Sequence, residues 1–148
     1  MTDAPRFKFF HPIHVSFRDL DGMRHVNHAV YLSYAEAARS LYWMKVTGIE
    51  RLEDFDFVLA ELTARYRASA QLHDRLVVGC RVTELRRSSF LMEHEIRNAD
   101  TGQPVFEMTS VQVMFDYAKG AVIPISDVRR RQIEAFEGRS LSAPTSYT

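Results

Sequence analysis

The chain has 148 residues, of which 46% are hydrophobic and 26% charged, and its 19 basic and 19 acidic residues cancel. A chain of this length can bury the core of one domain without disulfides or a structural metal ion. The balanced charge provides no basic surface for nucleic acid, and the single cysteine, Cys80, excludes an internal disulfide bond.

No stretch approaches the roughly 20 consecutive apolar residues that a membrane-spanning helix needs. The first residues, MTDAPRFKFFHPIHV, contain no apolar run long enough for a signal peptide. We therefore expect a cytoplasmic protein with no membrane segment and no nucleic-acid partner.

The first predicted element is a strand over residues 7–17, which are rich in aromatic and β-branched side chains. Pro12 cannot donate a hydrogen bond to a neighbouring strand, which favours a position at a sheet edge. A helix of about five turns is predicted over residues 27–48, where apolar residues recur every three or four positions. Gly48 supplies its C-terminal stop. Because apolar side chains surround most of this helix, we expect the rest of the domain to wrap it.

Further strands are predicted over residues 58–68, 76–85, 88–98 and 104–116. Apolar and polar side chains alternate in the first three, whereas the last is apolar on both faces and suits a central position. Ser126 and Asp127 can cap a short helix over residues 128–138. The order of elements predicts an α+β domain in which about five antiparallel strands form a curved sheet around the long helix. This single domain is expected over residues 1–137, with a disordered tail over residues 138–148.

The segment RDLDGMRHVNH, residues 18–28, concentrates ionisable groups directly before the long helix. The N-terminus of a helix carries unpaired N–H groups and a partial positive charge, which can stabilise an oxyanion. A carboxylate on the preceding loop, such as that of Asp21, can attack a carbonyl group or activate a water molecule. The segment therefore contains both parts of a hydrolytic site.

Residues in and after this segment form a pattern, which consists of Asp19, Asp21, His25, Val26, Asn27, Tyr31, Glu36 and Arg39. The pattern resembles the signature of hot-dog-fold acyl-CoA thioesterases, most closely the 4-hydroxybenzoyl-CoA thioesterase-like group. Weaker similarity continues through YRASAQLHDRLVV, RRSSFLMEHEI and AVIPISDVRR to about residue 131. One departure is Arg24, which precedes the His-Val-Asn triplet at a position where many members of the family have glycine.

The resemblance implies a hot-dog fold, in which a long helix is wrapped by an antiparallel sheet. It also implies that Asp21 is the catalytic carboxylate and that a backbone N–H near His28 is the oxyanion donor. His25 is a candidate for orienting Asp21 or binding water, although a purely structural histidine fits as well. Glu36, about two turns into the helix, is the alternative catalytic acid, or else the partner of Arg39 in an ion pair.

The remaining candidate residues are assigned to substrate binding, and they are Asn27, Tyr31, Arg65, Arg67, Arg86, Ser88 and Ser89. The resemblance suggests that Ser88 and Ser89 contact the pantetheine arm, whereas a turn would explain them equally well. The arginines can bind the phosphates of coenzyme A, or they form a solvated surface. Asn27 also suits the N-cap of the helix.

No metal site is expected, because the spacing of His25 and His28 differs from the i, i+4 pair of helical zinc sites. The predicted function is the hydrolysis of an acyl-CoA thioester to a free acid and coenzyme A, with no cofactor beyond the coenzyme A of the substrate. The alternatives are a non-catalytic acyl-CoA-binding domain, or a thioesterase or hydratase that acts on acyl-carrier protein. We expect a homodimer or homotetramer, because hot-dog domains generally place their active sites at protomer contacts.

Overall fold

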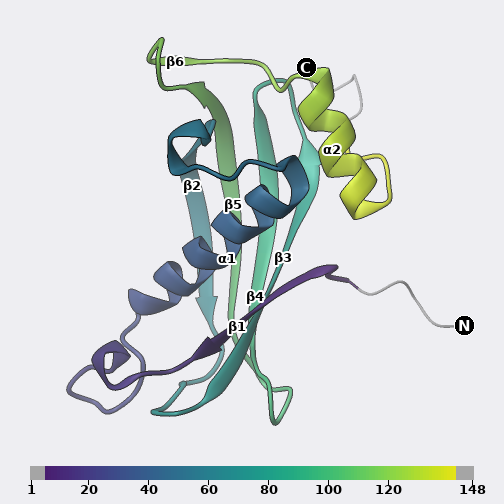
Figure 1. The fold of residues 1–148 in the computed structure, drawn as a ribbon. Coiled ribbons are helices and arrows are strands. Elements are labelled where there is room, and N and C mark those ends of the chain that lie inside the picture. Colours follow the sequence, from purple (N-terminus) through teal and green to yellow (C-terminus); the bar gives the residue numbers. More distant parts are fainter. Residues whose placement is uncertain (1–5, 143–148) are drawn as a thin grey trace, which may run out of the picture.

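The computed structural model describes residues 6–142. An antiparallel sheet curls around one long helix, α1, and a short helix, α2, lies near the C-terminal end (Figure 1). The elements are β1 (Phe9–His14), α1 (Val30–Thr47), β2 (Phe57–Tyr66), β3 (Arg75–Leu85), β4 (Ser89–Asn98), β5 (Pro104–Asp116), β6 (Ala121–Val122) and α2 (Asp127–Glu137). Single turns of 3₁₀ helix occur at Phe17–Asp19 and Leu52–Asp54. The predicted α+β class and the order of elements are confirmed.

The strands are arranged in the order β1-β3-β4-β5-β2, and β6 pairs with β5. Pro12 lies in β1 at one edge of the sheet, as its missing N–H predicts. Strand β5 lies between β4 and β2, which confirms the interior position expected for a strand that is apolar on both faces. The two-residue strand β6 was not predicted, because so short a segment has no periodicity.

Helix α1 packs mainly against β3, and also against β1 and α2. Its buried side includes Tyr34, Ala38 and Tyr42, which recur at four-residue spacing. Gly48 ends the helix with φ 78°, a left-handed conformation that glycine adopts without strain. The opposite side of α1 is exposed at Glu36 and Leu41, so the sheet of one chain wraps the helix only in part.

The sheet has an inner face toward α1 and an outer face that carries charged residues. Alternation along β4 buries Phe90, Met92, His94 and Ile96, as predicted. On the outer face, the ring of Phe7 lies against Gly79 in β3, where an added Cβ would come within 2.8 Å of the ring. The buried ring of Phe7 thus anchors the chain before β1 to the outer face.

Helix α2 begins after Ser126, whose side chain accepts a hydrogen bond from the Arg129 N–H, as the capping prediction required. Part of the segment predicted as a disordered tail packs against β3 instead. Leu141 is buried, and its backbone oxygen accepts a hydrogen bond from the Leu85 N–H at 2.8 Å. This contact extends the ordered chain to Ser142, and residues 143–148 lie outside the described residues. Within residues 6–142 no helix is long and apolar enough to cross a membrane.

Candidate active site

A cleft of about 300 Å³ lies at the N-terminal end of α1. Figure 1 shows this end of the helix at the lower left. Its walls come from the polar segment before the helix, the first turn of α1 and the chain around the end of β2. The lining residues are Asp21, Met23, His25, Val26, His28, Tyr31, Tyr66, Arg67, Ala68 and Ser69. The structure therefore brings together the predicted site residues Asp21, His25, His28, Tyr31 and Arg67.

Asp21 begins a tight turn that ends at His25. The Arg24 N–H donates to the Asp21 carbonyl oxygen at 3.0 Å, and the Asp21 N–H donates to the His25 carbonyl oxygen at 3.1 Å. The carboxylate of Asp21 accepts a hydrogen bond from the Met23 N–H at 2.8 Å. This local bond, which is typical of Asp at a turn, fixes one oxygen and leaves the carboxylate at the wall of the cleft.

Arg24 adopts a left-handed backbone conformation with φ 68°. This conformation is unfavourable for residues with a Cβ atom and favourable for glycine. It therefore gives a physical reason for the glycine that many members of the resembled family have before the His-Val-Asn triplet.

Asp19 has a different environment from Asp21. Its Oδ2 accepts hydrogen bonds from the Ser16 N–H at 2.9 Å and from the Tyr34 hydroxyl at 2.7 Å. Burial raises the pKa of Asp19, but these hydrogen bonds outweigh the burial and the net pKa is lowered. Because the Asn27 N–H also donates to the Asp19 carbonyl oxygen, Asp19 holds the polar segment against α1.

The backbone that leads into α1 is held by three hydrogen bonds. The Asn27 side chain accepts from the Ala29 N–H at 2.9 Å, and the Asn27 carbonyl oxygen accepts from the Val30 N–H at 2.9 Å. The Tyr66 hydroxyl donates to the His28 carbonyl oxygen at 2.7 Å. Asn27 was predicted as the N-cap of the helix, but α1 begins at Val30 after Ala29, which is the N-cap residue and receives no side-chain cap. Asn27 instead stabilises the turn before the helix through its bond from the Ala29 N–H. Within residues 6–142 the His28 N–H donates no hydrogen bond, and His28 lines the cleft.

Tyr31 forms the inner wall of the cleft and is itself almost fully buried. Its ring stacks on Phe106, with the ring centroids 5.3 Å apart, and its hydroxyl accepts from the Ala70 N–H at 3.0 Å. Burial raises the pKa of Tyr31, so its hydroxyl stays protonated at neutral pH. Tyr31 therefore closes the bottom of the cleft and ties α1 to the chain that follows β2.

These positions allow acyl-transfer chemistry at the cleft. The Asp21 carboxylate can act as a nucleophile or a general base, and the His28 N–H is a donor held by its neighbours before any substrate binds. The partial positive charge of the helix N-terminus adds to the stabilisation of an oxyanion at this place.

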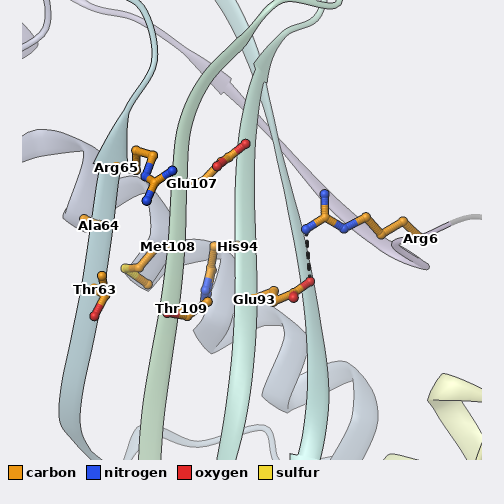
Figure 2. Close-up of a pocket in the computed structure, with 9 residues that line it drawn as sticks. All are labelled: Arg6, Thr63, Ala64, Arg65, Glu93, His94, Glu107, Met108 and Thr109. Atoms are coloured by element: carbon orange, nitrogen blue, oxygen red, sulfur yellow. Dashed lines mark hydrogen bonds and ion pairs between the residues drawn. The ribbon is translucent and has the colours of Figure 1, made fainter.

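Arg65 and Arg67 occupy different surroundings. Arg67 lines the cleft and forms an ion pair with Glu107 at 3.0 Å. Arg65 lies in a second hollow, of about 190 Å³, on the outer face of the sheet. Figure 2 shows it beside Glu107 on β5, with Arg6 bonded to Glu93 on the other side of the hollow. The outer hollow thus combines charges of both signs.

Glu36, the alternative catalytic carboxylate, does not line the cleft of its own chain. Its side chain is 73% exposed, and one oxygen lies 4.0 Å from the buried guanidinium of Arg39. Burial lowers the pKa of Arg39, and the charge of Glu36 opposes that effect. The ion pair that was the second interpretation of Glu36 is therefore present.

Arg86, Ser88 and Ser89 lie at the other end of the sheet. They form the turn between β3 and β4, where the Arg86 N–H donates to the Ser89 carbonyl oxygen at 2.8 Å and Arg86 pairs with Glu84. The length of β3, at about 3.3 Å per residue, separates this turn from the cleft by on the order of 30 Å. A contact between these residues and a ligand in the cleft would therefore require a second copy of the chain.

Sequence reasoning missed Tyr66 and Met23. Tyr66 alternates with polar residues in β2, and periodicity alone cannot show that its hydroxyl reaches the His28 carbonyl oxygen. Met23 is 71% exposed, and the signal that could have marked it in the sequence is an apolar residue within the polar segment between Asp21 and Arg24. Among residues 6–142, no three His, Cys, Asp or Glu side chains are grouped so that they could hold a metal ion.

Comparisons with known proteins agree with this architecture. The sequence profile of the thioesterase-like superfamily matches residues 15–133. The acyl-CoA thioester hydrolase YbgC of Escherichia coli O6:H1 is 30% identical over 95 residues, which span 60% of this chain and 69% of YbgC.

Solved structures show the same fold. A thioesterase from Thermus thermophilus, crystallised with coenzyme A and zinc, is 36% identical with a TM-score of 0.83, and the match covers 91% of this chain and 98% of that one. A mutant of 4-hydroxybenzoyl-CoA thioesterase in complex with 4-hydroxybenzoyl-CoA is 18% identical with a TM-score of 0.75, over 84% and 96% of the two chains. This second likeness concerns the fold alone, and together the two confirm the predicted hot-dog fold.

Proposed function

The chain belongs to the thioesterase-like superfamily and is a thioester hydrolase, and from this premise we propose that it cleaves acyl-CoA in the cleft at the start of α1. Water adds to the thioester carbonyl carbon, the C–S bond breaks, and the sulfur of coenzyme A leaves as a thiol. The products are a free acid and coenzyme A.

The thioester carbonyl oxygen is placed at the His28 N–H in this proposal. The observation that carries the proposal is that Asp21 and His28, whose N–H donates no hydrogen bond within residues 6–142, line the same cleft. Negative charge develops on the carbonyl oxygen during the reaction, and a fixed donor in this position stabilises it, typically by about 10²–10³ in rate. Tyr66 supports the geometry, because it holds the neighbouring His28 carbonyl oxygen.

Asp21 supplies the second half of the reaction. It either attacks the carbonyl carbon and forms a mixed anhydride, which water then hydrolyses, or it removes a proton from the attacking water. His25 lines the same cleft and is placed to hold this water or to orient Asp21. The donor and the carboxylate together provide what thioester hydrolysis needs, so the proposed reaction uses no cofactor beyond the coenzyme A of the substrate. Full activity after treatment with a metal chelator is the expected result.

Coenzyme A is the proposed carrier of the acyl group. Support comes from the Thermus thermophilus thioesterase, which was crystallised with coenzyme A, and from the description of YbgC as an acyl-CoA thioester hydrolase. The location of the enzyme in the cytoplasm remains a prediction, which fractionation of cells would test.

A homodimer is part of the proposal. Strand β2 is a long edge strand, and its free N–H and C=O groups can pair with the same strand of a second copy. Antiparallel pairing of two β2 strands would bring the Phe57 end of one copy to the Tyr66 end of the other. Ser89 pairs with Val113 of β5, and Val113 also pairs with Val58 near the start of β2. The β3–β4 turn therefore lies at the same end of the sheet as the start of β2. Each cleft would then receive the β3–β4 turn of the other copy, with its predicted pantetheine and phosphate contacts.

The test is thiol release by the purified chain across short, medium, long and aromatic acyl-CoA substrates. Release of one thiol for each acid formed is the expected result for at least one of them. Tight binding of acyl-CoA with no thiol released would identify a non-catalytic binding domain instead. A change in enoyl-CoA absorbance without thiol release would identify a hydratase, and activity confined to acyl-carrier protein would replace the proposed carrier.

Glu36 offers the second candidate arrangement for the same reaction. It is exposed on the side of α1 that the sheet leaves uncovered, where the second copy of a dimer would lie. If Glu36 were the base, Glu36→Gln would abolish thiol release and Asp21→Asn would not. We expect the reverse, because only Asp21 shares a cleft with the His28 N–H in one chain.

A further inference from the structure

Arg24 is the residue whose backbone and side chain are least explained by the fold. Its φ of 68° is one of only two positive values among non-glycine residues in the described part of the chain. The turn from Asp21 to His25 requires this conformation at its fourth residue, and glycine would satisfy it without strain. Strained backbone positions of this kind are concentrated at functional sites.

The other residue with a positive φ, His73, provides a useful contrast. Its φ is 66°, and its ring lies 3.3 Å from the ring nitrogen of His14, so its side chain makes a contact within the protein. The guanidinium of Arg24 makes no hydrogen bond and no ion pair with any residue between 6 and 142. The backbone of Arg24 therefore serves the turn, whereas its side chain makes no polar contact within residues 6–142.

The position of Arg24 indicates a role for its side chain in substrate binding. It is exposed, and it lies between Met23 and His25, both of which line the active-site cleft. The other arginine at the cleft, Arg67, is already paired with Glu107. Arg24 itself does not line the cleft, but it is an exposed positive charge, with no side-chain partner within residues 6–142, in the turn that borders a cleft whose proposed substrate carries phosphate groups.

We propose that Arg24 is a substrate-binding residue that holds a phosphate group of the pantetheine-bearing substrate at the cleft rim. The proposal rests on the proposed acyl-CoA thioesterase function and assigns this residue a specificity role within it. Arginine suits the role, because its planar guanidinium presents several donors to phosphate oxygens. Glycine at this position would make the folded domain more stable. The arginine therefore lowers the stability of the domain while it raises the affinity for the substrate.

The experiment measures kcat/KM for three thioesters with the same acyl group, namely acyl-CoA, acyl-4′-phosphopantetheine and acyl-pantetheine. The last has no phosphate and serves as the baseline. For Arg24→Gly we expect about a tenfold loss with acyl-CoA and less than about a twofold change with acyl-pantetheine. A loss of rate that already occurs with acyl-4′-phosphopantetheine places the contact at the phosphate next to the pantetheine, which coenzyme A and acyl-carrier proteins have in common. A loss only with acyl-CoA places it at the nucleotide.

Thermal unfolding of the same variants separates backbone strain from phosphate binding. Arg24→Gly relieves the strain, and we expect its Tm to rise by about 3 °C. Arg24→Ala keeps the strain and loses the guanidinium, so it should show the same kinetic loss without the rise in Tm. Arg24→Lys should retain part of the rate with acyl-CoA. Arg131→Ala removes an exposed arginine from α2 and is the matched control, with no expected change in kinetics.

Equal kinetics of Arg24→Gly and wild type on all three thioesters would overturn the proposal, even if Tm rises. Failure of the underlying function has a different signature, because the wild type would then hydrolyse none of the three. In that case, calorimetric binding of free coenzyme A decides the role of Arg24. Binding that weakens in Arg24→Gly supports it, and binding that is unchanged or undetectable in the wild type refutes it.

Discussion

Two aspartates that are separated by one residue have different environments, and this difference supports the different roles proposed for them. Asp19 accepts hydrogen bonds from Ser16 and from Tyr34, so its carboxylate is occupied within the fold. The carboxylate of Asp21 accepts only the local Met23 N–H among the described residues, and Asp21 borders the cleft. The sequence alone shows two aspartates in one loop. The resemblance pointed to Asp21, and the hydrogen bonds of Asp19 give a physical reason for the choice.

Tyr66 is predicted to act by positioning the peptide that follows His28. Tyr66→Phe removes the donor to the His28 carbonyl oxygen and leaves the ring contacts with Tyr31 and Phe106. We expect kcat to fall about fivefold to tenfold with KM nearly unchanged, because a loosened oxyanion donor affects the transition state more than the bound substrate. Steady-state kinetics would check this. A change confined to KM would show that Tyr66 contacts the substrate instead.

His94 is predicted to weaken the fold in acid. Burial lowers its pKa to about 3, and the charge of Arg39 adds to the effect. The unfolded chain binds a proton at this histidine below about pH 6.5, whereas the folded chain does not bind it until about pH 3. The stability that the neutral histidine provides is therefore fully present above about pH 6.5, and it is lost as the pH falls from there toward about 3. Between about pH 7 and 5 this single group should lower the free energy of unfolding by about 2 kcal/mol.

Urea unfolding at these two pH values tests the prediction. His94→Gln has no titrating group, so its stability should change by about 2 kcal/mol less between the two pH values than that of the wild type. His11→Gln, at a half-buried histidine of β1 whose side chain makes no hydrogen bond within residues 6–142, is the control for the loss of a histidine. An unaltered pH dependence in His94→Gln would show that His94 is not the group responsible.

At the scale of elements, the strands and the long helix followed from periodicity, because burial on one face imposes repeats of two or about 3.6 residues. The contact of Phe7 with Gly79 did not follow, since the chain crosses from the edge of the sheet to its outer face without any periodic signal. The left-handed conformation of Arg24 was equally hidden, because arginine carries no preference for it.

Gly79→Ala is predicted to destabilise the domain through the contact with Phe7. The added Cβ would lie 2.8 Å from the Phe7 ring, and this ring is only 5% exposed. We expect a loss of about 1–3 kcal/mol, because the ring must shift to make room. Denaturant unfolding measures the loss, with Gly22→Ala as the control, since nothing lies within 4 Å of a Cβ built there. Equal stability of the two variants would mean that Phe7 moves at no cost.

At the scale of the whole molecule, the sequence could not place Arg86, Ser88 and Ser89 relative to Asp21. Whether two loops lie at the same end of the sheet depends on how many antiparallel strands separate them along the chain. Whether they meet in one site depends also on any second copy of the chain that pairs at an edge of the sheet. In one chain the two groups lie at opposite ends of the sheet. Their predicted shared role with the cleft therefore depends on the proposed dimer.

Charges on the edge strand are predicted to prevent the dimer. Leu59→Lys combined with Thr63→Lys places two positive charges on the exposed edge strand β2, where they would repel the same charges on the β2 strand of the other copy. We expect light scattering to give a dimer for the wild type and a monomer for this variant, with thiol release reduced in the monomer. Val122→Lys on β6, at a position that is 57% exposed, is the control. A monomeric wild type with full activity would contradict the account of the dimer.

The central claim is that Asp21 and the His28 N–H perform thioester hydrolysis in one cleft. The most direct test compares the rate of thioester cleavage in a single turnover between wild type and Asp21→Asn, with affinity for coenzyme A and circular dichroism measured on both proteins. We predict that cleavage slows by about 10²–10⁴ while affinity and fold remain unchanged. Cleavage within about threefold of the wild-type rate would contradict the claim and transfer the chemistry to another carboxylate, with Glu36 the first to examine.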